Sequence, residues 1–204
     1  MRLKTMEKVL LTAFLAFFTF CVFSVSAKNS VSDKLIRLHV KANSDSAFDQ
    51  ELKLKVRDAV INIMKKDIKG KDIETVKSEI TAMLPEIKKT AEDTVNSSDA
   101  DYGVKAALER HYFPTREYAD FALPSGDYET LYIELGEAKG KNWWCVLFPP
   151  LCIAASEGET IENTAESSGF SNGDVSFITG ETSGYKIKFK IAEVYGDLKH
   201  RIFH

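Results

Sequence analysis

The fold prediction starts from Lys141–Cys152, which reads KNWWCVLFPPLC and holds two tryptophans, one phenylalanine, two prolines and two cysteines. Residues 142–148 have the composition of a strand. Upstream, residues 130–135 alternate between apolar and polar side chains, and a turn bracketed by glycines at 136–140 joins the two segments. The sequence therefore predicts a β-hairpin over residues 128–148, with the quoted stretch as its second strand.

Another alternating strand is predicted at residues 35–40. Ile36, Leu38 and Val40 should share one face, and Arg37 and His39 should share the other with Leu35. A helix should follow over residues 47–68, because Ser46 is a good N-cap and apolar residues then recur at helical spacing. Its water-facing side should carry Glu51, Lys53, Lys55 and Asp58.

Pro85 removes a backbone donor in the middle of a helical pattern, so we expect a break or a kink there between two more helical segments. One begins at Asp72 and ends before the proline, and the other covers residues 86–95. The period then changes to two, so residues 102–112 are expected to form a strand that ends before Pro114.

This order of elements is typical of an α+β domain, with a mixed or antiparallel sheet that includes a hairpin and helices packed on one face. We expect this core within residues 28–155. Residues 156–184 are rich in serine, glycine and glutamate and are predicted to be a flexible loop, with brief order around 175–178. Residues 185–204 fit a helix better than a strand and should pack on the core as a C-terminal helix.

The N-terminus has the pattern of an export signal. Basic residues among the first eight precede an uncharged apolar run over residues 9–25, and Ala27–Lys28 then fits a signal-peptidase site. The run holds 17 residues, at the lower edge of what spans a bilayer. Residues 1–27 are therefore predicted to be either a cleaved signal peptide or an uncleaved membrane anchor, and both place the rest of the chain outside the cytoplasm.

Composition argues against several functions. Removing residues 1–27 takes away three positive charges and one negative charge, so the formal net charge falls from −3 to −5. Nucleic acid is thus an improbable partner, because phosphate binding needs a surplus of lysine and arginine. The four histidines show no metal-ligand spacing, and the GxSxG, HExxH, P-loop and GxGxxG motifs are absent. We predict no catalytic residue, no metal and no cofactor.

Cys145 and Cys152 are the two cysteines outside the apolar run, and an even pair in an exported domain is most simply a disulfide. The prolines between them favour the chain reversal that the bond requires. Two alternatives stay open, namely buried free thiols and a nucleophilic cysteine, although a nucleophile would need a basic partner from elsewhere in the fold.

The two tryptophans are adjacent, so on a strand they must point to opposite faces. One can join the core, and the other needs cover from the fold or from a partner. The alternatives are burial on both sides and an exposed aromatic and proline patch that binds a partner. The second alternative predicts a binding surface with a contact tip at residues 148–151, held in one shape by the disulfide loop. Its residues would be Trp143, Trp144, Phe148, Pro149, Pro150 and Leu151.

Polar residues gather where the first strand passes into the first helix: His39, Asn43, Asp45 and Asp49. A hydrolytic or metal site is conceivable there, since strand-to-helix loops often carry function. Turn and cap chemistry explains the same residues more simply, because asparagine and aspartate suit tight turns and helix starts.

Three stretches resemble one protein family. LIRLHVKANSDSAFDQELKLKVRDAV at 35–60, LERHYFP at 108–114 and YETLYIELGEAKG followed by KNWWCVLFPPLC at 128–152 are similar to the stage II sporulation protein R family of endospore-forming, Gram-positive bacteria. The resemblance covers about residues 34–152 well, and the motifs are long and unusual. At Lys41 this chain has a lysine where the resemblance leads us to expect an apolar residue.

The resemblance implies a signalling function. Members of this family are made in the forespore and exported into the space between its membrane and that of the mother cell. There they activate a membrane-embedded aspartic protease of the mother cell, which removes the pro-sequence of sigma factor E. This implies an activating ligand that is not itself an enzyme and that contacts the membrane only through its N-terminal segment.

Two other functions stay open. One is a secreted hydrolase or thiol enzyme that uses Cys145 with His39 brought near by the fold, and the other is a structural protein of the wall or membrane surface. The sequence leaves the oligomeric state undetermined.

Overall fold

The computed structural model describes residues 5–118, 121–150 and 169–180, and only the backbone of residues 20–30 and 177. The chain forms two compact units, and each is described by itself. The sheet unit contains residues 33–111 and 127–171, and the second unit contains residues 1–32, 112–126 and 172–204.

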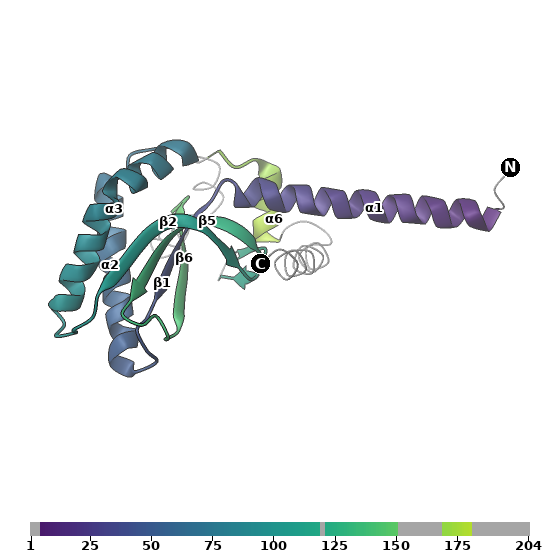
Figure 1. Ribbon diagram of the computed structural model, residues 1–204. Coiled ribbons are helices and arrows are strands. Elements are labelled where there is room, and N and C mark those ends of the chain that lie inside the picture. Colours follow the sequence, from purple (N-terminus) through teal and green to yellow (C-terminus); the bar gives the residue numbers. More distant parts are fainter. Residues whose placement is uncertain (1–4, 119–120, 151–168, 181–204) are drawn as a thin grey trace. The chain divides into compact units, whose positions relative to one another are not determined.

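A four-stranded mixed sheet is the centre of the sheet unit. Its spatial order is β2-β5-β1-β6, and β1 runs parallel to β5 and antiparallel to β6. The strands are β1 (Ile36–Lys41), β2 (Val104–Phe113), β5 (Gly126–Leu135) and β6 (Asn142–Phe148). The predicted α+β class with a mixed sheet is confirmed (Figure 1).

The predicted hairpin over residues 128–148 is wrong. Its two strands, β5 and β6, both exist, but β1 lies between them and pairs with each. Leu38 of β1 is opposite Leu131 on one side and Cys145 on the other. The physical reason is that β1 is apolar on one face and buried over most of its length, so a central position gives it hydrogen-bonding partners along both edges.

Two helices cover one face of this sheet, α2 (Ala47–Asp67) and α3 (Ile73–Asn96) (Figure 1). Ser46 caps α2 as predicted, since its side chain accepts a hydrogen bond from the backbone N–H of Asp49. Asp72 caps α3 in the same way, through the backbone N–H of Thr75.

Of the predicted break or kink at Pro85, the break does not occur, because α3 continues through the proline. Figure 1 shows α3 as one helix that bends along its length. Pro85 and Thr81 are both exposed, so the Thr81 carbonyl that loses its partner at the proline can be solvated. Buried residues on both sides of the proline, among them Ile80 and Ile87, keep the helix on the core.

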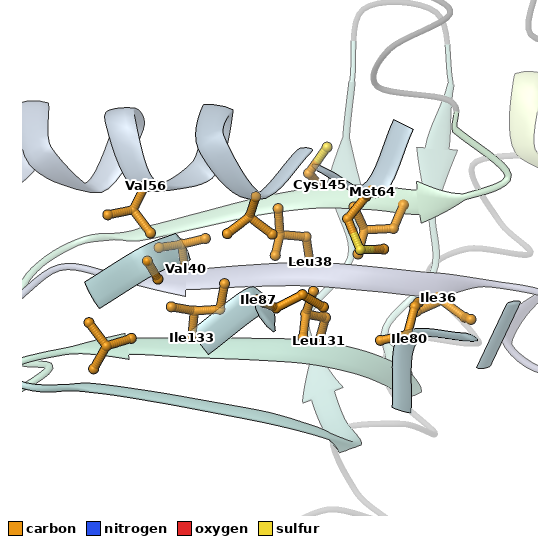
Figure 2. Close-up of a cluster of buried hydrophobic side chains, with 14 of the residues drawn as sticks. Ile36, Leu38, Val40, Val56, Met64, Ile80, Ile87, Leu131, Ile133 and Cys145 are labelled. Carbon is orange, nitrogen blue, oxygen red and sulfur yellow. The ribbon is translucent and has the colours of Figure 1, made fainter. Parts of the chain in front are cut away.

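The core lies between the sheet and these two helices. β1 contributes the aliphatic side chains that the sequence pattern places on one face, and β5, β6, α2 and α3 contribute the rest. Figure 2 shows how these side chains meet: Ile36, Leu38, Val40, Leu131, Ile133 and Cys145 from strands, and Val56, Met64, Ile80 and Ile87 from helices. Removing this apolar surface from water is the main force that holds the helices on the sheet.

Lys53 of α2 is not on the water-facing side, as the helical pattern predicts, but is buried. Its Nζ donates to Gln50 Oε1 at 2.7 Å and to the carbonyl oxygen of Lys141 at 3.2 Å. Burial of a lysine is tolerated here because these two acceptors replace water. The buried lysine thus fixes the start of the KNWWCVLFPPLC stretch to α2.

The second unit contains α1 (Thr5–Ser32), the short antiparallel strands β3 (Arg116–Glu117) and β4 (Ala122–Leu123), and α6 (Asn172–Thr179). α6 lies in the segment predicted to be a flexible loop and includes the stretch 175–178, where brief order was expected. The predicted C-terminal helix at 185–204 lies outside the described residues.

The apolar N-terminal run forms most of α1, which continues past the predicted cleavage position at Ala27–Lys28. Its described part exposes several large apolar side chains: Met6, Val9, Leu10, Leu11, Phe14, Leu15, Phe17 and Phe18. Within the part of the chain that the structure describes, no helix is both long enough and apolar enough to cross a membrane.

Candidate functional site

The two tryptophans of β6 point to opposite faces of the sheet, as the sequence predicts. Trp143 packs against the core, and the guanidinium carbon of Arg57 lies 4.2 Å from the centre of a Trp143 ring. Trp144 lies on the opposite face, beside His39 of β1. One tryptophan therefore stabilises the core, while the other belongs to a face that α2 and α3 do not cover.

We call the face opposite α2 and α3 the histidine face. On β1, β5 and β6 its side chains include Arg37, His39, Lys41, Thr130, Tyr132, Glu134, Trp144 and Val146. At one end of this face the side chains are fully buried, since Arg37, Thr130 and Val146 have no exposed surface. The other end, from His39 to Lys41, is half-buried. A partner can reach this face at the half-buried end.

Four rings meet at the half-buried end. The centre of the His39 ring lies 4.7 Å from that of Tyr132, 5.6 Å from that of Trp144 and 6.4 Å from that of His111. The centres of His111 and Tyr132 are 4.4 Å apart. Such distances are those of favourable tilted and edge-to-face contacts. We call His39, His111, Tyr132 and Trp144 the ring cluster.

Three polar atoms of the ring cluster, one each on His39, Tyr132 and His111, are bonded to neighbours. His39 Nε2 lies 2.8 Å from Asn142 Oδ1, Tyr132 Oη donates to Glu134 Oε1 at 2.9 Å, and His111 Nε2 lies 2.9 Å from Glu109 Oε1. With these three polar atoms engaged, the rings offer a partner their faces and edges. This arrangement suits contact with another molecule better than proton transfer.

Burial lowers the pKa of His39 to about 4. The hydrogen bond with Asn142 opposes this effect, and the nearby His111, Lys41 and Arg37 reinforce it. Burial also raises the pKa of the Tyr132 hydroxyl, and so does the bond to Glu134. Both rings are therefore neutral at pH 7.

Cys145 lies on the other side of the sheet. It is 2% exposed, belongs to the core, and is opposite Leu38 in the strand register. His39 is opposite Trp144 and points to the histidine face. The fold therefore separates Cys145 from His39, and a thiol site built from these two residues is wrong. Cys152 lies outside the described residues, so the disulfide stays a prediction.

The predicted contact tip is largely buried. Phe148 is 6% exposed and belongs to the core, Pro149 is buried, Pro150 is exposed, and Leu151 lies outside the described residues. At the beginning of the stretch, Lys141 and Asn142 are exposed, and Trp143 and Trp144 are half-buried. A binding role for the stretch stays a prediction, and its geometry favours that beginning.

The polar residues predicted near the first helix form a network that ties two loops together. The buried Asp49 carboxylate accepts hydrogen bonds from Asn43 Nδ2, Ser44 Oγ and Tyr102 Oη. Burial alone would raise the pKa of Asp49, but these bonds and one with Ser46 hold it below the ordinary value. His39 is not part of this network, and turn and cap chemistry accounts for the remaining residues.

The same loop holds the turn before β6. Asn43 Oδ1 accepts from the backbone N–H of Glu137 at 2.9 Å, and Asp45 Oδ1 accepts from that of Lys141 at 2.7 Å. Gly140 donates its N–H to the carbonyl oxygen of Ala42 at 2.9 Å. These bonds position residues 136–141, and hence the start of β6, against the end of β1. In the described residues, no group of three or more His, Cys, Asp or Glu side chains could hold a metal ion.

Sequence reasoning missed Tyr132 and His111 as candidate site residues. Tyr132 sits at a polar position of the predicted strand at 130–135, so the alternation already placed it opposite the core. The feature that could have identified Tyr132 was its aromatic ring, which stands at a position where a water-facing side chain was expected. Its proximity to His39 depends on the pairing of β1 with β5, which the predicted hairpin excluded.

Comparisons with known proteins agree with the resemblance seen in the sequence. The model of the family described as stage II sporulation protein R matches residues 32–158. The curated stage II sporulation protein R of Bacillus subtilis (strain 168) is 43% identical over 136 residues, which is 65% of this chain and 60% of that relative. The chain thus spans about 60% of the relative's length. No solved structure matches. The chain belongs to the stage II sporulation protein R family.

Proposed function

We propose that this protein is an exported sporulation signal that activates a membrane-embedded aspartic protease of the mother cell. In this proposal the protease then removes the pro-sequence of sigma factor E. The protein acts as an activating ligand, not as an enzyme, and works in the space between the forespore and the mother cell. The observation that carries the proposal is the family match, whose range of 32–158 includes every strand of the four-stranded sheet.

The histidine face supports a role in binding. Its half-buried end presents four rings, of which His39 and Tyr132 have hydrogen-bonded polar atoms, a composition suited to contact with another protein. A thiol enzyme, the alternative function, gains no support, because Cys145 and His39 lie on opposite faces of the sheet.

The N-terminal segment supports export. Its described part exposes several large apolar side chains along α1, as expected of a segment that is recognised by export machinery or held by a lipid surface. In the proposal this segment is a cleaved signal peptide or an anchor, and it provides the membrane contact.

The test is co-expression in a non-sporulating bacterium. The full chain, the candidate protease and the pro-form of sigma factor E are produced together, and cleavage is followed by immunoblotting. Cleavage should require both the full chain and the protease. A matched control lacks residues 1–27, stays in the cytoplasm and should not support cleavage. Absence of cleavage with the full chain secreted and the protease in the membrane would overturn the proposal.

A further inference from the structure

The strand β2 lies at one end of the four-stranded sheet. It pairs with β5 on one side, and among the described residues no strand pairs with its other edge. β2 is ten residues long, and its Lys105 and Glu109 side chains are exposed. An edge strand of this kind presents a row of backbone N–H and C=O groups that a strand of another molecule can join.

One hydrogen bond shows which backbone groups of β2 point to this open edge. The carbonyl oxygen of Gly103, the residue before β2, accepts from the N–H of Gly136, the residue after β5, at 2.9 Å. Gly103 therefore directs its backbone groups toward β5. Because this direction alternates along a strand, every second residue from 104 to 110 points its N–H and C=O away from β5.

This alternation limits how two copies of β2 can pair as antiparallel strands. The outward-pointing residues of the two copies must lie opposite each other, so a two-fold axis passes through one residue and its copy. With Ala107 on the axis, Lys105 lies opposite Glu109 of the second copy, and this pair occurs twice. With Glu109 on the axis, two carboxylates would face each other. Axes through Ala106 or Leu108 pair neither charge with its opposite.

We propose that this protein forms a two-fold dimer, in which the β2 edges of two copies pair antiparallel with Ala107 on the axis. The two four-stranded sheets then form one continuous sheet. This assembly goes beyond the signalling function proposed above and does not depend on it.

The uncharged side chains next to the axis fit this arrangement. Opposite residues at a position like that of Ala107 have Cα atoms about 4.5 Å apart, so a small side chain suits the axis. On the other face of the sheet, Ala106 lies opposite Leu108 of the second copy. Both are half-buried and pack against the core, so pairing removes further apolar surface from water.

Lys105 and Glu109 have contacts within their own chain that are compatible with the dimer. Lys105 Nζ lies 3.3 Å from Glu134 Oε2, and Glu109 Oε1 lies 2.9 Å from His111 Nε2. An exposed ammonium group has three donors and can contact two carboxylates, and a carboxylate has a second oxygen that can accept from it. In the dimer Lys105 therefore lies between Glu134 of its own chain and Glu109 of the second copy.

Charged residues usually protect an edge strand from association. On β2 they instead select one partner and one register, because opposite charges meet when the strand pairs with its own copy about Ala107. Arg110 does not interfere, since it lies opposite the apolar Val104 of the second copy. Its guanidinium contacts the carbonyl oxygen of Asp127 at 2.8 Å and the carboxylate of Asp33 at 3.4 Å.

The test measures the mass of the full chain in detergent by sedimentation equilibrium. The wild type should be a dimer at about 100 μM. Lys105→Glu and Glu109→Lys should each dimerise at least about tenfold more weakly, because each variant places like charges opposite each other twice. The matched control Lys71→Glu changes an exposed lysine after α2 and should keep wild-type dimerisation. All variants keep α1, so association through its apolar side chains is common to them.

A mixture of the two charge variants separates pairing from misfolding. Each variant alone should be mainly monomeric, but an equimolar mixture should form a heterodimer with nearly wild-type affinity. The reason is that its two chains again place opposite charges face to face at both pairs. A variant that had lost its fold could not be rescued in this way.

Cysteine cross-linking tests the register. Ala107→Cys should give a covalent dimer on oxidation, because Cα atoms about 4.5 Å apart are within the range of a disulfide. Ala82→Cys, on the exposed surface of α3, is the matched control and should cross-link no more than the wild type.

Three outcomes would overturn the dimer. The first is a wild type that stays monomeric at about 100 μM. The second is a wild-type dimer that neither charge variant weakens and that Ala107→Cys does not cross-link, because another surface would then hold it. The third is a monomeric wild type that captures the detergent-solubilised protease and loses this capture in the charge variants, because the β2 edge would then bind the protease. Cleavage of the pro-form of sigma factor E is not measured, so failure of the dimer leaves the proposed function untouched.

Discussion

Asp49 offers the sharpest test of how the loops around β6 are held. Its carboxylate is 5% exposed and accepts hydrogen bonds from Asn43 Nδ2 at 2.9 Å, Ser44 Oγ at 2.5 Å and Tyr102 Oη at 2.8 Å. Replacing Asp49 with alanine leaves all three donors without their acceptor. The network joins the first strand-to-helix loop to the residue two positions before β2.

The expected loss of unfolding free energy in Asp49→Ala follows from the number and type of these hydrogen bonds. A hydrogen bond to a charged group contributes about 1.5–3 kcal/mol, but the three donors are half-buried and can partly return to water. We therefore expect Asp49→Ala to lower the free energy of unfolding by about 3–4 kcal/mol, less than the sum of three full bonds. That is a large part of the roughly 5–15 kcal/mol of a typical domain.

The assay is urea unfolding of the chain from Lys28 onward, followed by the fluorescence of Trp143 and Trp144. Tyr102→Phe removes one donor and should cost about 1–2 kcal/mol. Glu51→Ala, an exposed acid on the same helix, should leave the unfolding midpoint unchanged. A loss below about 1 kcal/mol for Asp49→Ala would refute the reasoning, because the donors would then be satisfied without the carboxylate.

The same carboxylate predicts a pH dependence. Since the folded pKa of Asp49 lies below its ordinary value of 3.8, the network contributes stability above that pH and loses it as pH falls through the folded pKa. The difference in unfolding free energy between wild type and Asp49→Ala should therefore shrink on acidification below pH 4. A difference that stays constant down to pH 2 would contradict this assignment.

Three further predictions test other contacts. In Gly140→Ala the new Cβ would lie 2.1 Å from the backbone carbonyl oxygen of Ser44, so we expect a loss of about 2–4 kcal/mol in urea unfolding. His39 has a folded pKa of about 4 against 6.5 unfolded, so wild-type stability should fall by about 2 kcal/mol, after allowance for solvent screening, as pH drops from 6.5 to 4. His39→Phe should lack this fall when unfolding is measured across the range. If the predicted disulfide forms, Cys145→Ser and Cys152→Ser should reduce cleavage in the co-expression assay equally; a loss confined to Cys145 would argue against the bond.

Local structure was the part of the fold that the sequence could predict. The alternation in β1 and the Ser46 cap of α2 depend on neighbours a few residues away, and both are confirmed. The strand pairing was not predictable in the same way. Residues 136–140 suit a hairpin turn, and nothing in β5 or β6 alone reveals that β1, about ninety residues earlier than β5, lies between them. The continuous helix at Pro85 could not be predicted from local sequence either, because packing on both sides of the proline overrides its helix-breaking preference.

The candidate site depends on that pairing. Trp144 could be assigned to the face opposite Trp143 from their adjacency alone, but its neighbours could not, because His39 and Tyr132 reach it only when β1 lies beside both β5 and β6. With a hairpin, Tyr132 would lie directly across from β6, and His39 would have no place between them. The central position of β1 thus explains two features together. It places Cys145 in the core, away from His39, and it brings Lys41 beside Asn142 at the accessible end of the sheet. Within the described part of KNWWCVLFPPLC, residues 145–148 therefore stabilise the core, whereas Lys141, Asn142 and Trp144 keep accessible surface.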